Sequence, residues 1–259
     1  MAPSAPTLDE DLALAHRLVD LASEVALEFF HRGVETIIKE DNSPVSEADL
    51  EVDRRMLEVL VAERPDDAVL SEESGARAGG NRRWILDPID GTFNFVEGRP
   101  AWGTHVALEV DGELVLGVIS RPVYELRYWA TRGGGAYKRG TGAGGAGPTR
   151  LAVSTTTDLA PSRVTVWSNP SADRLGTLRR ECVLVEPASL DNILAVAEGE
   201  LEAVIDSRGK IWDHAPAVII VTEAGGAFRD REGGRRLDLG TSRYTNGRID
   251  EKLRALLDG

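Results

Sequence analysis

The spacing of apolar residues predicts two amphipathic helices at the start of the chain. The first lies between a Thr7-x-x-Glu10 capping pattern and Gly33. A short extended piece ending at Ile37-Ile38 precedes the second, which ends at Arg64-Pro65 because the residue before proline disfavours the helical conformation. The expected apolar positions are Leu12, Ala15, Val19, Ala22, Ala26 and Phe30 in the first helix and Leu50, Met56, Leu57, Leu60 and Val61 in the second.

Apolar runs bounded by turn residues predict strands in the middle of the chain. A buried strand over 84–86 is expected to end at Asp87, because the proline that follows has no N–H to donate to a sheet. Residues 104–110 and 114–120 flank Asp111-Gly112, a dipeptide typical of hairpin turns. Further strands are expected over 68–70 and 126–130, and the Gly/Ala-rich stretch Arg139 to Thr149 is expected to form a flexible hairpin loop.

The pattern changes after Leu151, where strands alternate with helices as in an α/β fold. We therefore expect a single domain over 1–259, with an N-terminal α+β half (about 7–150) and a C-terminal α/β half (about 151–259). The elements expected after Leu151 are strands over 163–167, 182–185 and 203–205, a helix near 172–180 and a helix ending near Gly199.

Composition narrows the class of protein. A chain of 259 residues with 42% hydrophobic residues is long enough to bury a sizeable core. Its 43 acidic and 30 basic residues give a net charge of −13, which argues against a nucleic-acid or anionic-membrane surface. The single cysteine, Cys182, indicates a reducing compartment, and the start of the chain has no leader pattern, so a soluble cytoplasmic protein is expected.

The most informative stretch is the one that follows the buried strand, Asp87-Pro88-Ile89-Asp90-Gly91-Thr92. Two carboxylates held this close repel each other unless one binds a proton or a cation lies between them. Magnesium is a cation that prefers such oxygen ligands. If a helix starts after Asp90, the N–H groups of Gly91 and Thr92 suit a phosphate. Alternatively, Asp90 caps a helix and Asp87 is a turn residue.

This stretch, followed by Asn94-Phe95, resembles the signature of the inositol monophosphatase family. That family comprises magnesium-dependent, lithium-sensitive phosphomonoesterases, including histidinol-phosphatases and some fructose-1,6-bisphosphatases. The resemblance implies a five-layer αβαβα sandwich and a homodimer. It also implies direct hydrolysis of a phosphate ester without a phosphoenzyme, with two or three Mg²⁺ ions bound.

Three further motifs fit the resemblance. The segment Ser43-Pro44-Val45-Ser46 with Asp49 is similar to the family's N-terminal motif, which implies that Asp49 and Thr92 orient the attacking water. Ser46-x-x-Asp49 is also a helix-capping pattern, so a purely structural Asp49 stays open. Glu72-Glu73 matches the family's Gly-Glu-Glu motif with Ser71 in place of glycine, which implies that Glu72 is a ligand and catalytic and that Glu73 supports it. A solvated turn is the alternative.

The second family signature is Trp212-Asp213-His214-Ala215 with Glu223-Ala224-Gly225-Gly226 downstream. The resemblance implies that Asp213 completes a metal site formed by Glu72, Asp87, Asp90 and the carbonyl of Ile89. On residue chemistry alone, the favoured interpretation of Asp213 is a helix N-cap. The four histidines show no metal-ligand spacing and are expected to be structural.

The substrate is where the motifs diverge from the family. Asp206 is a candidate substrate contact together with Asp90, Gly91 and Thr92, although a strand-end aspartate is the alternative. Residues 184–191 match neither of the family's pocket elements. Inositol monophosphate is the expected substrate and histidinol phosphate the alternative. A protein that binds a phosphorylated metabolite without turnover is a third possibility, of a different class.

Overall fold

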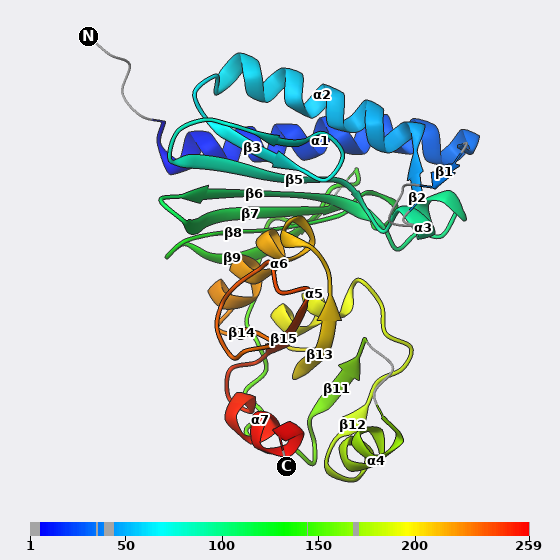
Figure 1. Ribbon diagram of the computed structural model, residues 1–259, viewed down its shortest axis with the longest axis vertical. Coiled ribbons are helices and arrows are strands. Elements are labelled where there is room, and N and C mark those ends of the chain that lie inside the picture. Colours follow the sequence, from blue (N-terminus) through cyan, green and yellow to red (C-terminus); the bar gives the residue numbers. More distant parts are fainter. Residues whose placement is uncertain (1–5, 35, 39–43, 144, 168–170, 259) are drawn as a thin grey trace.

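The structure is a computed structural model that describes residues 6–34, 36–38, 44–143, 145–167 and 171–258. Its elements form five layers, in the order helices, sheet, helices, sheet, helices (Figure 1). The predicted αβαβα sandwich is therefore confirmed. The outer helices on the first sheet are α1 (Leu8–Arg32) and α2 (Glu47–Glu63), those between the sheets are α5 (Asn192–Ala197) and α6 (Ile211–Glu223), and those beyond the second sheet are α4 (Ala172–Glu181) and α7 (Asp250–Asp258).

Among the described residues the first sheet has eight strands in the order β10-β9-β8-β7-β6-β5-β3-β4. The predicted hairpin is present, and its turn residues Asp111 and Gly112 both have positive φ, as a tight hairpin turn requires. The strands are β3 (Ala68–Ser71), β4 (Gly75–Arg77), β5 (Arg82–Asp90), β6 (Gly103–Val110), β7 (Glu113–Arg121), β8 (Leu126–Thr131), β9 (Gly135–Gly140) and β10 (Thr149–Arg150). A separate pair is formed by β1 (Thr36–Ile38) and β2 (Pro44–Ser46).

Strand β5 corrects one prediction, because it continues through Pro88 to Asp90 instead of ending at Asp87. The register with β6 shifts between Asp87 and Asp90, so the proline lies where the regular ladder is interrupted and needs no donor. Both aspartates therefore belong to one strand, on either side of this irregularity.

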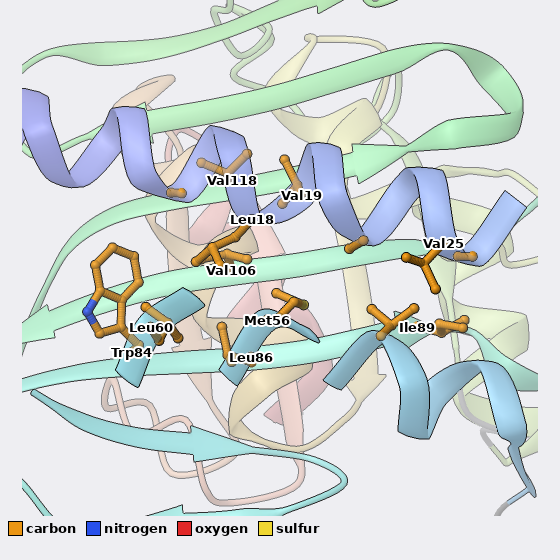
Figure 2. Packing of buried hydrophobic residues seen from close by; sticks show 14 of the residues in the cluster. Leu18, Val19, Val25, Met56, Leu60, Trp84, Leu86, Ile89, Val106 and Val118 are labelled. Carbon is orange, nitrogen blue, oxygen red and sulfur yellow. The ribbon is translucent and has the colours of Figure 1, made fainter. Parts of the chain in front are cut away.

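Helix α1 has the predicted capping box, formed by Thr7 and Glu10. The predicted apolar face of α2 is only partly right, since Leu50 and Val61 are exposed. The buried face of α2 runs through Val52, Met56 and Leu60, at a spacing of one helical turn. Figure 2 shows this packing, with α2 and α1 side chains on Trp84, Leu86 and Ile89 of β5. The core thus holds β5 rigidly from the helix side.

The second sheet has the order β12-β11-β13-β15-β14 among the described residues. The strands β12, β11 and β13 are parallel, whereas β15 runs antiparallel to β13 and β14. The bounds are β11 (Arg163–Val166), β12 (Val183–Leu184), β13 (Ala203–Arg208), β14 (Ala227–Asp230) and β15 (Thr241–Thr245). No helix in the described ranges is long and apolar enough to cross a membrane.

The two sheets lie on either side of residue 150 in the sequence, with β10 ending at Arg150 and β11 starting at Arg163. A division of one domain into halves near that point remains a prediction. The end of β13 leads directly into α6, which packs on β5, β6, β7 and β8 of the first sheet. This helix therefore connects the second sheet to the strand that carries the aspartate pair.

Candidate metal and phosphate site

Four carboxylates line one cavity of about 270 Å³, and we call them the acid wall. Asp87 and Asp90 lie on β5, Glu72 directly follows β3, and Asp213 lies in the first turn of α6. Since β3 pairs in parallel with β5, Ser71 lies beside Leu86 and the following residues of both strands emerge at one edge. Residues far apart in the sequence are thus brought together by the sheet and by α6.

The acid wall has the electrostatics of a cation site. Burial, followed by the charges of Glu72, Asp90 and Asp213, raises the pKa of the Asp87 carboxyl well above its usual value. Burial also raises the pKa of Asp213, whose carboxyl shares a hydrogen bond with Asp87. Oδ1 of Asp87 is buried and has no hydrogen-bond partner among the described residues. An all-oxygen set with an unsatisfied buried oxygen fits a hard divalent cation such as Mg²⁺.

Asp90 differs from its neighbours because two nitrogen-bearing side chains contact it. His105 Nε2 and Arg121 Nη1 each lie 3.2 Å from Asp90 Oδ2. Burial alone would raise the pKa of Asp90, but the charges and hydrogen bonds of His105 and Arg121 outweigh it and lower the pKa. Ligand atoms of Asp87, Asp90 and His105 lie within 4.8 Å of one another, so this histidine belongs to the group of side chains that could hold a metal ion.

Sequence motifs miss both His105 and Arg121. The histidine spacing predicts a structural role for His105, and no motif points to Arg121. The available signal is strand register, because the Asp111-Gly112 hairpin sets the pairing of β6 with β7. Asp87 pairs with His105 across β5 and β6. The hairpin therefore indicates only that Arg121 lies near Gly103, whereas the pairing of Asp87 with His105 depends on the register of β5 with β6, which no turn motif sets.

The turn after β5 leads into the short helix α3 (Thr92–Val96) with Gly91 as its N-cap. Gly91 has a φ of 84°, a conformation that favours glycine. A Cβ atom at this position would also lie only 2.6 Å from Leu190 Cδ1. Glycine at position 91 is thus favoured both by the backbone conformation and by the close approach of the Leu190 side chain. Gly91 and Thr92 line the cavity beside the acid wall, as the phosphate prediction requires.

Thr92 and Asp49 are in contact. The Thr92 hydroxyl can donate to two acceptors, Asp49 Oδ1 and the Ile89 carbonyl oxygen. Each of them lies 3.1 Å from Thr92 Oγ1. Asp49 Oδ2 accepts from the backbone N–H and the hydroxyl of Ser46, so the predicted capping box is present as well. The capping and active-site interpretations of Asp49 are therefore compatible, one for each oxygen. Ser43 of the same motif lies outside the described residues.

The two residues of the Glu72-Glu73 motif differ in their position relative to the cavity. Glu72 lines it, whereas half-buried Glu73 is not among the lining residues. Ser71, which departs from the family's glycine, is buried and its hydroxyl donates to Asp53 of α2. The serine that replaces the family's glycine therefore has a hydrogen-bond partner outside the acid wall.

Asp213 accepts a hydrogen bond from the Lys210 N–H at 2.6 Å, and Lys210 is the N-cap of α6. The N-cap interpretation of Asp213 was therefore wrong by three positions, since Asp213 lies inside the helix. The next residue, His214, is buried at the cavity, and its Nδ1 lies 2.8 Å from the Tyr244 hydroxyl. Burial lowers the pKa of His214 to about 4, so this imidazole is neutral at physiological pH.

Asp206 is placed away from the acid wall. It lies in β13 with a φ of 55° and forms an ion pair with Arg174, at 3.0 Å between Oδ2 and Nη1. The cavity is lined instead by the next two residues, Ser207 and Arg208. The structure thus brings seven of the predicted site residues to the cavity and Asp49 into contact with Thr92, but Glu73 and Asp206 are not among the lining residues.

Apolar side chains also line the cavity, and we call four of them the apolar wall: Trp167, Leu190, Ile193 and Leu194. Leu190 belongs to the segment 184–191, which matched no family element. The neighbouring Asp191 bonds to Arg121, with 3.0 Å between Oδ1 and Nε. This segment therefore places Leu190 against Gly91, and both residues line the cavity.

Comparison with known proteins agrees with this geometry. The model of the inositol monophosphatase family matches residues 7–258. A protein named glucose-1-phosphate thymidylyltransferase from Streptomyces griseus is 46% identical over 253 residues, which cover 96% of each chain. The histidinol-phosphatase of Mycobacterium tuberculosis is 34% identical over 253 residues, covering 94% of this chain and 96% of that one.

The fold is shared with solved structures. An inositol monophosphatase from Thermotoga maritima superposes with a TM-score of 0.81 at 25% identity, covering 97% of each chain. The family match spans nearly the whole chain and includes all four carboxylates of the acid wall. The chain therefore belongs to the inositol monophosphatase family and is a phosphoric monoester hydrolase, as the sequence predicts.

Proposed function

We propose that this protein is a Mg²⁺-dependent phosphatase that hydrolyses a small polyol or amino-alcohol phosphate by direct attack of water. One observation carries the proposal. Four carboxylates converge on a cavity that also contains the α3 turn, and a buried oxygen of Asp87 has no partner in the described part of the chain. Such a cluster costs stability unless a cation balances it, which supports a metal site built for use.

The residues that would hold Mg²⁺ are Glu72, Asp87, Asp90, Asp213 and the carbonyl of Ile89. All of them line the cavity. When bound, two or three such ions would lower the pKa of a water molecule and offset charge on the leaving oxygen. The remaining steps belong to the protein's own side chains.

Thr92 and Asp49 would orient the attacking water. Because the Thr92 hydroxyl donates toward Asp49, a lone pair of its oxygen remains to accept a hydrogen bond from water. Burial raises the pKa of Asp49, while its bonds to Ser46 and Thr92 oppose that rise. These same bonds fix the orientation of the carboxylate. Thr92 is therefore placed to accept a proton from the attacking water while it passes its own proton to Asp49.

The phosphate would bind at the start of α3. Backbone N–H groups at a helix start attract anions, and here Gly91 and Thr92 present them beside the acid wall. The phosphate would then lie between the protein's N–H groups and the metal ligands. Neighbouring cation and anion sites are the arrangement that phosphoryl transfer requires.

The size of the cavity favours a small substrate. Its volume of about 270 Å³ is below the range of roughly 300–1,000 Å³ that is typical for drug-sized ligands. The name of the Streptomyces griseus relative describes nucleotidyl transfer, which needs two phosphorylated substrates. A cavity of this size favours one small ester instead. Inositol monophosphate is the first substrate to test, and histidinol phosphate is the alternative that the Mycobacterium relative's name supports.

The remaining parts of the proposal concern the setting. We infer a cytoplasmic homodimer, with a small phosphorylated metabolite as its partner and no nucleic acid or membrane. The net charge of −13 argues against a nucleic-acid or anionic-membrane partner, the single cysteine supports a reducing compartment, and the homodimer is inferred from the family resemblance.

Phosphate release from a substrate panel tests the function. The panel contains inositol monophosphate, histidinol phosphate and fructose 1,6-bisphosphate, each with Mg²⁺ and with EDTA. We expect turnover that needs Mg²⁺ and is lost in Asp90→Asn. Asp111→Asn is the matched control, because Asp111 lies in the exposed β6–β7 turn.

The outcomes separate the two classes of function. Mg²⁺-dependent release by the wild type and the Asp111→Asn variant, but not by Asp90→Asn, supports hydrolysis at this site. Saturable binding of a substrate without release of phosphate would instead indicate the non-catalytic binding protein.

A further inference from the structure

Arg121 is a buried arginine at the end of β7 with a carboxylate on each side. Only 2% of its side chain is exposed. Its Nη1 lies 3.2 Å from Asp90 Oδ2, and its Nε lies 3.0 Å from Asp191 Oδ1. A buried guanidinium is stable only when it is paired, so both contacts contribute to holding it. Arg121 thus links the acid wall to the segment that carries the apolar wall.

The sheet is shaped to admit this side chain. Asp90 pairs with Gly103 across β5 and β6, and Thr104 pairs with Ser120 across β6 and β7. Gly103 therefore lies between Asp90 and Arg121. A Cβ atom on Gly103 would lie 2.5 Å from Arg121 Nη1 and 2.1 Å from the Ser120 carbonyl oxygen. Only glycine lets the guanidinium reach Asp90 here.

The contact creates a conflict with metal binding. A Mg²⁺ ion held by Asp90 would need the carboxylate whose Oδ2 Arg121 and His105 contact. The ion would also be repelled by a fixed positive charge within a few ångströms. Asp191, on the other side of the guanidinium, offers Arg121 a second acceptor that is not part of the acid wall.

We propose that Arg121 is a positioning residue that serves as the counter-ion of Asp90 in the metal-free protein, so that Mg²⁺ binds in competition with the guanidinium. The inference rests on the metal site of the proposed function. When Mg²⁺ binds, Asp90 would bind the ion instead of Arg121, and Arg121 would keep its hydrogen bond to Asp191. Arg121 therefore stabilises the empty acid wall and lowers its affinity for Mg²⁺.

Arg121→Met tests this directly, because it removes the charge and keeps much of the length. Calorimetric titration with Mg²⁺ alone should show a dissociation constant lower by about tenfold, since a fixed charge next to the ion is gone. A purely structural role predicts the opposite, a weaker or unchanged affinity. Thermal unfolding should show a larger loss of Tm in EDTA than in saturating Mg²⁺, because the metal replaces the missing counter-ion.

Arg127→Met is the matched control. Arg127 lies on the neighbouring strand β8, is also 2% exposed, and pairs with Asp20 of α1 on the opposite face of the sheet. The decrease in Tm of this variant, relative to the wild type, should be the same in EDTA and in saturating Mg²⁺. Its Mg²⁺ affinity should equal that of the wild type.

Asp191→Asn is a second test that does not depend on the folding of an Arg121 variant, since the Asp191 side chain is 37% exposed. Without Asp191, Arg121 has Asp90 as its remaining carboxylate, so the dissociation constant for Mg²⁺ should rise several-fold.

An unchanged Mg²⁺ affinity in Asp191→Asn, or an unchanged or weaker one in Arg121→Met, would overturn the inference while leaving the phosphatase intact. A wild-type protein that binds no Mg²⁺ would instead overturn the proposed function, and this inference with it.

Discussion

Three of the four carboxylates of the acid wall lie in regular elements, whereas the apolar wall lies on two connecting segments and one short helix. Asp87 and Asp90 belong to the strand β5, which is packed on both faces by helices. Leu190 precedes α5, a helix of six residues, and Trp167 directly follows β11. Rigid strands hold reacting groups in place, while connecting segments vary at little cost to the core. We therefore expect the acid wall to set the chemistry and the apolar wall to set the substrate.

The largest effect should come from Asp87→Asn. Loss of this carboxylate removes a metal ligand, and we expect kcat/KM to fall by about a thousandfold or more. The same change relieves repulsion in the empty site, because burial and the charges of Glu72, Asp90 and Asp213 raise the pKa of Asp87 well above its usual value. The Tm in EDTA should therefore rise, by roughly 2 °C or more.

Phosphate release and thermal unfolding in EDTA measure these two effects on one sample. An Asp87→Asn protein that retains activity, or that is less stable than the wild type in EDTA, would show that Asp87 is a structural residue. Leu190→Ala serves as the comparison from the apolar wall and should leave Mg²⁺ binding unchanged.

The second prediction separates water orientation from metal binding. Thr92→Val keeps the shape of the side chain but removes the hydroxyl that contacts Asp49 and the Ile89 carbonyl. We expect kcat to fall by about a hundredfold, the lower end for loss of a positioned proton-transfer group. Mg²⁺ affinity should stay the same, because the carboxylates are untouched.

Thr104→Val is the matched control for this variant. Thr104 is buried on β6 and its hydroxyl donates to the Pro88 carbonyl at 2.9 Å, a bond of the same kind outside the proposed water site. Equal losses of kcat in the two variants would mean that Thr92 acts only through the stability of the turn.

The contrast between the walls also explains how far the sequence is informative. The acids belong to motifs of a few residues each, so Asp87 and Asp90 stand out by their spacing, and Glu72 and Asp213 by their resemblance to the family's motifs. Helices α1, α2, α4 and α5 and most strands follow from the residue pattern, because helix and strand spacing are local properties, whereas the C-terminal helix α7 was not predicted. The predicted end of β5 was wrong, since an interruption of the ladder at Pro88 depends on the neighbouring strand.

The residues that local patterns miss depend on tertiary pairing. His105 and Arg121 reach Asp90 only through the register of three strands and the missing side chain of Gly103. The role of Leu190 depends on the approach of a connecting segment to Gly91, which no local pattern reports. Asp206 was selected by position relative to Asp213, yet its ion pair with Arg174 holds it outside the cavity lining.

The third prediction addresses the apolar wall. Leu190→Ala should change the ratio of kcat/KM between two substrates by about tenfold, the scale expected for a few methylene groups in a pocket. The variant has more room above Gly91, where a Leu190 methyl now lies. Steady-state kinetics with inositol monophosphate and histidinol phosphate gives the ratio, and equal losses for both substrates would place Leu190 outside substrate selection.

The smallest expected effect is a pH dependence that belongs to the acid wall alone. Burial and like charges raise the pKa values of Asp87 and Asp213 above the usual value of 3.8. The folded protein therefore holds more protons than the unfolded chain at pH values above about 4, so stability falls as pH rises through the raised pKa values. Asp90, whose pKa is lowered, stays ionised in both states over this range.

In EDTA, we thus expect the Tm to fall as the pH rises above about 4, by a few degrees for a chain of this length. Saturating Mg²⁺ should flatten the curve, because the ion replaces the protons as the balancing charge. Asp87→Asn should flatten it without metal, since it removes the most strongly shifted group, whereas Leu190→Ala should keep the wild-type slope. A slope that survives in Asp87→Asn would place the responsible carboxyls elsewhere in the protein and separate the pH dependence from the metal site.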